Sequence, residues 1–159
     1  MTSSFQTSIP LPVTASFAPA FAAYFILLNL RTSKARVESN TYMGNDVAAT
    51  KPDNTKQPLL PSPAGHSLQI ESRSHSNYVE NVPFALLLTA FVEANGGNPK
   101  ALTVSLLGLL FFRVVHVEFG LRAKNALGWG RPVGYFGTLA YVAALSGYGA
   151  WLVRSFWIN

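Results

Sequence analysis

Residues 73–92 read "RSHSNYVENVPFALLLTAFV", so that polar side chains lead directly into an apolar run. If this stretch is one helix, Arg73, Asn77 and Glu80 are spaced i, i+4 and i+7 and share one face. An ionised carboxylate at membrane depth is unfavourable unless it faces a wet cavity or a partner. The stretch therefore predicts a membrane-buried helix with one polar face.

The composition favours a membrane protein over a soluble one. Of 159 residues, 49% are hydrophobic and only 12% are charged, which is unusual for a soluble domain. There is no cysteine, which excludes a disulfide, a thiolate metal site and a nucleophilic Cys, so any thiol chemistry must arrive with a ligand. The net charge of +5 does not indicate nucleic acid, because the basic residues flank apolar runs instead of forming a stripe with aromatics.

Apolar runs long enough to cross a membrane occur more than once. A helix needs about 20 mostly apolar residues to span the hydrocarbon core. Runs 9–30 and 132–153 qualify outright, whereas 78–92 and 101–120 are shorter and have polar ends. The turn sequence "EANGGNPK" (93–100) joins these two. We predict an all-α, polytopic membrane protein of one domain, a bundle of four transmembrane helices at about 10–30, 70–93, 100–121 and 132–154.

Basic residues predict the orientation of these helices. They cluster in 31–36 and 122–131, and residues 1–8 have none. By the positive-inside rule, the two basic loops face the cytosol, and both chain ends lie away from it. A cleaved signal peptide would carry its basic residues before the first apolar run, so we expect a membrane helix there. The polar, proline-rich segment 39–67 is expected to be a flexible cytosolic loop.

Small residues line one side of the fourth predicted helix. They recur at three- and four-residue steps: Gly134, Gly137, Ala140, Ala144 and Gly147. Such a stripe lets a neighbouring helix approach closely, which favours packing within a bundle or an oligomer.

Two readings of the polar face remain open. The hairpin between the second and third helices places Arg113 at the depth of Glu80, with His116 one turn further along. In the structural reading, Glu80 and Arg113 neutralise each other. In the functional reading, water reaches the face from the cytosol, and the face binds a small ligand that carries both positive and negative charges. The arginines bind the carboxylates of the ligand through paired hydrogen bonds, and Glu80 binds its ammonium group.

Other ionisable groups lie off this face. His75 is rotated away from it by the helical period and is expected to be structural. Glu118 and Arg122 form an i, i+4 pair in the favourable order, which we interpret as a solvated or interfacial surface.

The segment "RSHSNYVENVP" resembles the second-helix signature of the membrane-associated proteins in eicosanoid and glutathione metabolism, the MAPEG family, which reads approximately Arg-x-(His/Gln)-x-Asn-x-x-Glu-x-x-Pro. The resemblance covers about 10–38 and 68–154 and leaves 40–66 unmatched. It implies a homotrimer in an intracellular membrane, such as the endoplasmic reticulum of a eukaryote, with glutathione as co-substrate between subunits. It also implies a glutathione S-transferase-like or peroxidase-like activity on a hydrophobic, membrane-dissolved substrate.

The resemblance also assigns site residues, none of them metal ligands. Arg131 matches the arginine that stabilises the glutathione thiolate, with Arg122 as its rival. A tyrosine that several synthases carry one turn beyond His116 is replaced by Gly120. A neighbouring subunit supplies a basic residue from its first helix, Arg31 or Arg36. The remaining implied contacts with glutathione are Arg73, His75, Asn77, Glu80, Arg113 and His116.

Two alternatives belong to other classes of protein. A non-catalytic MAPEG-like membrane scaffold would keep the bundle, and even bind glutathione, without turnover. A small transporter or proton relay would line a transmembrane path with Glu80, Arg113 and His116. Flux that survives loss of Arg131 would indicate the transporter.

Overall fold

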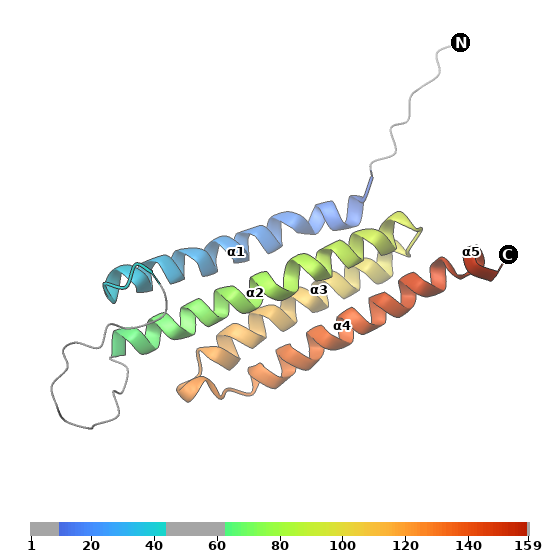
Figure 1. Ribbon diagram of the computed structural model, residues 1–159. Helices are drawn as coiled ribbons and strands as arrows, with labels where there is room; N and C mark the ends of the chain where they lie inside the picture. The colour runs from blue at the N-terminus through green and yellow to red at the C-terminus, as the bar shows by residue number, and fades with distance from the viewer. Residues whose placement is uncertain (1–9, 44–62, 159) are drawn as a thin grey trace, which may run out of the picture.

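The computed structural model describes residues 10–43 and 63–158. Its long helices are α1 (Pro12–Glu38), α2 (Pro63–Ala94), α3 (Pro99–His116) and α4 (Gly130–Leu152), and they run side by side (Figure 1). Proline opens the first three, where its missing N–H would have no partner within the helix in any case. Three short helices complete the list: η1 (Val117–Leu121), a π-helical turn that continues α3, then η2 (Lys124–Ala126) and α5 (Arg154–Ile158). The described residues contain no strand, which confirms the all-helical prediction.

Two helices are longer than their apolar runs. α1 continues to Glu38, past the expected end at residue 30, and stops where Asn40 adopts a left-handed φ of 50°. α2 begins at Pro63, within the segment expected to be a loop. The expected boundaries fell short because the turns beyond them are polar, and an exposed helix also accepts polar residues. Residues 44–62, the middle of the predicted loop, lie outside the described residues.

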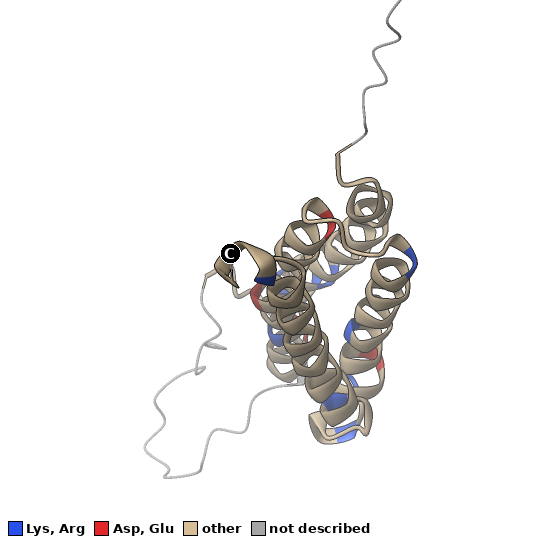
Figure 2. Ribbon diagram, turned by 90° about the vertical axis from the view of Figure 1, so that its right-hand side faces the viewer, with Lys and Arg blue, Asp and Glu red and all other residues tan. Residues whose placement is uncertain are grey.

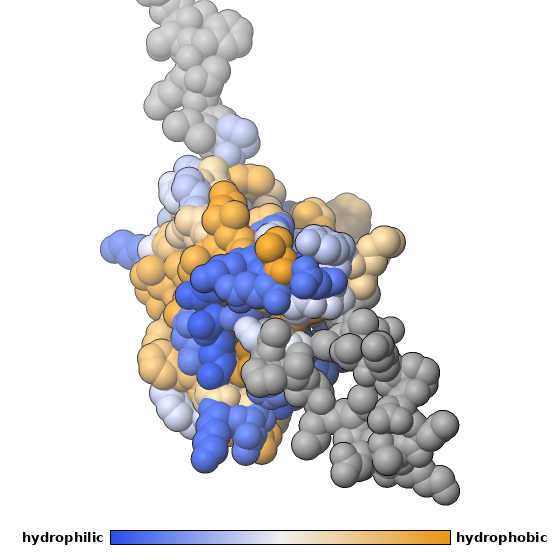
Figure 3. All heavy atoms as spheres, turned by 90° about the vertical axis from the view of Figure 1, so that its left-hand side faces the viewer, coloured by the Kyte–Doolittle hydropathy of each residue, from blue (hydrophilic) through white to orange (hydrophobic). Residues whose placement is uncertain are grey.

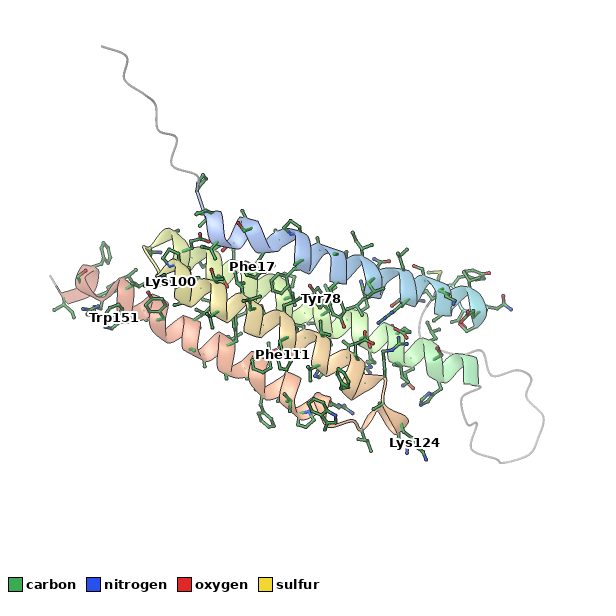
Figure 4. The ribbon with its side chains drawn as sticks, turned by 180° about the vertical axis from the view of Figure 1, so that it is seen from behind. Phe17, Tyr78, Lys100, Phe111, Lys124 and Trp151 are labelled. Carbon is green, nitrogen blue, oxygen red and sulfur yellow. The ribbon has the colours of Figure 1, made fainter. Side chains whose placement is uncertain are left out.

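The helices pack in pairs, α1 on α2 and α3 on α4, and α2 also contacts α4. Leucines from α1 and α3 fill the centre and are fully buried: Leu28, Leu102, Leu106 and Leu109. Near the middle of α2, the Tyr78 hydroxyl donates to the carbonyl of Phe21 at 2.7 Å (Figure 4). A hydroxyl pair between Thr89 and Tyr141 joins α2 to α4. Buried polar groups therefore tie neighbouring helices together.

The outer surface of the helices is apolar. Side chains that are more than half exposed include Ile26, Leu30, Phe84, Leu87, Phe91, Val104, Leu107 and Phe111. Charged residues occupy few positions along the ribbons (Figure 2). In the described residues, two helices are long and apolar enough to cross a membrane, α1 and Pro99–Leu121. α4 was expected to qualify and does not, because its glycines and tyrosines dilute the apolar run. That α2 and α4 also cross stays a prediction.

At the end of the molecule where α2 turns into α3, Glu93 caps the start of α1. Its carboxylate accepts the backbone N–H groups of Val13 at 2.6 Å and Thr14 at 2.8 Å, and the Thr14 hydroxyl at 2.6 Å. Leu11, the residue before α1, supplies no side-chain cap of its own. The first turn of α1 is thus completed by another helix.

Glycine allows α4 to start close against the end of α3. A Cβ on Gly134 would lie 2.6 Å from the carbonyl oxygen of Phe112 and would also meet the His116 side chain. A Cβ on Gly120 would lie 2.6 Å from the backbone nitrogen of Arg131. The glycine at position 120 therefore makes room for the backbone that carries Arg131.

Candidate functional site

A cleft of about 910 Å³ opens between α2, the α3–α4 connection and the first turns of α4. It lies at the end of the molecule that holds the last turns of α1, the start of α2 and the α3–α4 connection. At this end, hydrophilic atoms gather and apolar atoms surround them (Figure 3). One wall is polar and belongs to α2, and the opposite wall mixes polar and aromatic groups. The residues that matter below are Arg73, Asn77 and Glu80 on the first wall, and His116, Arg131, Tyr135 and Phe136 on the second.

The α2 wall has the geometry that the spacing predicts, since Arg73, Asn77 and Glu80 all line the cleft. Arg73 and Glu80 are both exposed. Within the described residues, neither of them forms an ion pair. One cation and one anion, separated by two helical turns, are therefore available to a ligand.

Arg113 lies behind this wall and is only 2% exposed. Its Nη1 donates to Oδ1 of Asn77 at 2.9 Å, and its Nη2 donates to the carbonyl of Gly134 at 2.7 Å. The ion pair with Glu80, one of the two readings from sequence, is absent. Asn77 takes its place because it is the α2 residue level with Arg113, while Glu80, almost one turn further along, is exposed at the cleft.

His116 connects the end of α3 to the start of α4. Its Nδ1 lies 3.0 Å from the carbonyl oxygen of Arg131. A carbonyl oxygen only accepts, so Nδ1 carries the proton of this hydrogen bond. The exposed guanidinium of Arg131 donates to the carbonyl of Ala126 at 3.2 Å and also lines the cleft. The backbone of Arg131 is thus held by His116, and its side chain reaches the cleft from the same point.

Two expected ligand contacts lie elsewhere in the single chain. The His75 ring packs against Phe25 of α1, with ring centroids 5.4 Å apart, and its buried Nε2 has no hydrogen-bond partner. Arg31 donates to Glu118 at 2.5 Å. Neither residue lines the cleft. Among the described residues, the cleft that one chain assembles takes its polar groups from α2, α3, η2 and α4, and none from α1.

Four charged side chains form a chain of ion pairs on the other side of α2. Arg31 of α1 bonds Glu118 of η1, whose second oxygen lies 3.4 Å from Nε of Arg122. Arg122 also bonds Glu71 of α2, whose side chain is only 11% exposed. The Glu118–Arg122 pair is thus part of a connection between three helices. Arg122, the rival to Arg131, is committed to this connection, whereas Arg131 faces the cleft.

Some lining residues were not identified from sequence. His66 and Gln69 line the cleft but fall in or beside the segment expected to be a loop. Tyr135 and Phe136 lay within an apolar run without a distinguishing pattern. For His66 and Gln69 a signal existed, because they continue the face of Arg73 at the helical period.

Comparison with known protein families gives a match over most of the chain. A model of the MAPEG family matches residues 14–151, nearly the whole chain. No curated protein and no solved structure matches the chain. The match includes the α2 signature, the polar positions of α3 and the start of α4. The chain therefore belongs to the MAPEG family, the membrane-associated proteins in eicosanoid and glutathione metabolism.

Proposed function

We propose that the cleft binds glutathione and that the protein uses its thiol to conjugate or reduce a hydrophobic substrate dissolved in the membrane. The observation that carries this proposal is the convergence of Arg73, Asn77 and Glu80 with Arg131 on one cleft of about 910 Å³. Its volume is in the range of small-molecule sites, about 300–1,000 Å³.

The charges of the cleft complement those of glutathione. The tripeptide has two carboxylates and one ammonium group. A guanidinium such as Arg73 binds a carboxylate through two parallel hydrogen bonds, and the carboxylate of Glu80 accepts the ammonium group. Asn77 is held in place by Arg113, so its amide presents a fixed donor to the ligand. The two exposed charges thereby set the direction in which the tripeptide lies along α2.

Arg131 is the group that we propose activates the thiol. A thiol with a pKa of about 8.5 is only slightly ionised at neutral pH. A guanidinium beside the sulfur favours the charged form and so increases the nucleophile. Tyr135 and Phe136 line the same wall and are exposed. They give an apolar substrate a route to the sulfur from the side of the bilayer.

We further propose that all four long helices cross the membrane and that the protein is a homotrimer with the cleft end toward the cytosol. Along α2, the face of Glu80 continues as the exposed side chains Phe84, Leu87 and Phe91, which a neighbouring copy would cover. The small-residue stripe of α4 supports close packing of the same kind. To bind the ligand of a neighbouring copy, Arg31 would have to give up its ion pair with Glu118. Arg36 is therefore retained as the other candidate for the basic residue that α1 supplies to the neighbouring site.

The proposal is tested by glutathione binding to the detergent-purified protein, measured by calorimetry, together with the ultraviolet difference spectrum of the thiolate. Arg73→Ala and Glu80→Gln are expected to weaken binding at least about tenfold, the equivalent of one lost charge-assisted contact. Arg131→Ala is expected to bind glutathione and lose the thiolate signal. Lys124→Ala and Glu38→Gln remove matched exposed charges that do not line the cleft (Lys124 is labelled in Figure 4).

Each outcome distinguishes the classes of function. Binding with a thiolate signal that needs Arg131 supports an enzyme, and turnover of a lipid-soluble halide or hydroperoxide then identifies its reaction. Binding without a thiolate signal or turnover leaves the non-catalytic member of the family. Absence of binding by the folded wild-type protein would overturn the proposed function.

A further inference from the structure

We propose that His116 is a further catalytic residue: its Nε2 accepts the proton that the bound thiol loses, and Arg131 then holds the thiolate. This inference rests on the proposed function and assigns the proton acceptor, which the guanidinium of Arg131 cannot be because it stays protonated in proteins.

The geometry fixes the form of the imidazole. Because Nδ1 donates to the carbonyl of Arg131 at 3.0 Å, the neutral ring has its lone pair on Nε2. His116 lines the cleft although it is only 4% exposed. A nearly buried ring with one nitrogen held by the backbone keeps its orientation, as a general base must.

His116 and Arg131 are also fixed relative to each other. The hydrogen bond joins the histidine ring to the backbone of the residue whose side chain lies at the cleft. The close approach of Gly134 to the His116 side chain holds the two helices together at this level. The proton acceptor and the cation therefore meet the sulfur as one unit, without a loop that must close.

The step balances without a further reactant. The S–H bond breaks, its electron pair stays on sulfur, and the proton bonds to the lone pair of Nε2. The imidazolium then gives the proton to water in the open cleft. When sulfur attacks an electrophilic carbon, its electron pair forms the S–C bond and the leaving group departs with the pair of the bond that breaks.

The surrounding charges favour passing the proton on. Arg113 lies one turn earlier on α3, Arg131 lies on α4, and Arg73 and Glu80 line the α2 wall. Three cations and one anion disfavour a lasting imidazolium and favour a lasting thiolate. His116 is therefore a relay, which returns to the neutral form after each proton transfer.

The test is the rate at which the thiolate absorbance appears when glutathione is mixed with the protein in a stopped-flow instrument. His116→Asn is the informative variant, because the asparagine amide can still donate to the carbonyl of Arg131 but has no basic nitrogen. At saturating glutathione, we expect thiolate formation slower by roughly 100-fold than in wild type, and partial rescue by added imidazole. In the variant, thiolate must come from glutathione already ionised in solution, so its rate should rise about tenfold per pH unit below the thiol pKa.

Two results would overturn the inference in different ways. Thiolate formation at the wild-type rate in His116→Asn, with glutathione bound, would show that His116 is not the acceptor and would leave the proposed function intact. Absence of glutathione binding by wild type would remove both. If His116→Asn does not fold, His116→Gln replaces it in the same comparison. Arg131→Ala is the contrast, since it should lose the final thiolate signal and not only the speed of its appearance.

Discussion

Arg113 joins Asn77 to Gly134: one nitrogen of its guanidinium donates to the Asn77 side chain at 2.9 Å and another to the Gly134 carbonyl at 2.7 Å. A residue that resembles a ligand contact in the sequence thus lies beneath the cleft and connects α2 to α4. Its planar fork reaches two acceptors on different helices at once, which an ammonium group does less well.

Arg113→Lys is therefore expected to destabilise the protein. Lysine keeps the charge but leaves one of the two acceptors without its donor, which costs about 1–3 kcal/mol in the free energy of unfolding. Thermal unfolding in detergent, followed by circular dichroism, measures the change. Arg73→Lys, at an exposed position on the same polar region, should stay within about 0.5 kcal/mol of wild type. Equal melting temperatures for the two variants would contradict the role given to Arg113.

Gly134→Ala is expected to separate α4 from α3. The added Cβ would meet the carbonyl oxygen of Phe112 at 2.6 Å, so the backbones must move apart at a cost of about 1–3 kcal/mol. Gly147→Ala is the control in the same helix, because nothing lies within 4 Å of its added Cβ. It should be neutral or stabilising, since alanine favours helix. In the thiolate assay, Gly134→Ala should lose the signal that depends on Arg131, and Gly147→Ala should keep it.

Glu71→Gln tests the chain of ion pairs. The change leaves Arg122 without the most buried of its carboxylate partners, and we expect a loss of about 1–3 kcal/mol in the free energy of unfolding. Glu38→Gln removes an exposed i, i+4 partner that lies 3.7 Å from Lys34, for which less than about 1 kcal/mol is expected. If the two variants have the same melting temperature, the chain of ion pairs contributes no more to the stability of the protein than a surface ion pair does.

Glu93 makes the stability of the folded protein depend on pH. Burial raises the pKa of its carboxyl, but the hydrogen bonds from Thr14 and Val13 lower it by more, so the pKa lies below its ordinary value of 4.5. A depressed pKa in the folded state means that the carboxylate stabilises the protein at pH values above the unfolded pKa, and that this stabilisation is lost as the pH falls through the folded pKa.

Glu93→Gln should therefore be less stable than wild type at neutral pH, by about 0.5–2 kcal/mol for a weakened helix cap. The difference should shrink as the pH falls below about 4.5, the ordinary pKa. Unfolding of both proteins between pH 7 and pH 3 measures it. A difference that stays constant over this range would contradict the assignment of the cap to the ionised carboxylate.

The sequence was sufficient for features that depend on periodicity. The spacing of Arg73, Asn77 and Glu80 determines that they share a face of α2, and the structure places all three at the cleft. The Glu118–Arg122 pair follows from the same rule and is present. Such patterns hold because the geometry of one helix is nearly invariant.

Contacts between helices could not be obtained in this way. Whether Arg113 meets Asn77 or Glu80 depends on the axial offset of α2 and α3, and an offset of less than one turn changed the partner. The pairing of Arg122 with Glu71 depends in the same way on how the end of η1 lies against α2. The extension of α2 back to Pro63 was missed as well. Hydropathy gave no sign of that extension, because the added turns are polar.

The capping of α1 by Glu93 bears on how the chain is made. Synthesis delivers α1 first, and its opening turn then has no acceptor for the amides of Val13 and Thr14. That acceptor exists only after Glu93, at the far end of α2, has left the ribosome and reached the start of α1. We therefore expect the first turn of α1 to stay frayed during synthesis and to become ordered only when α2 has packed beside it.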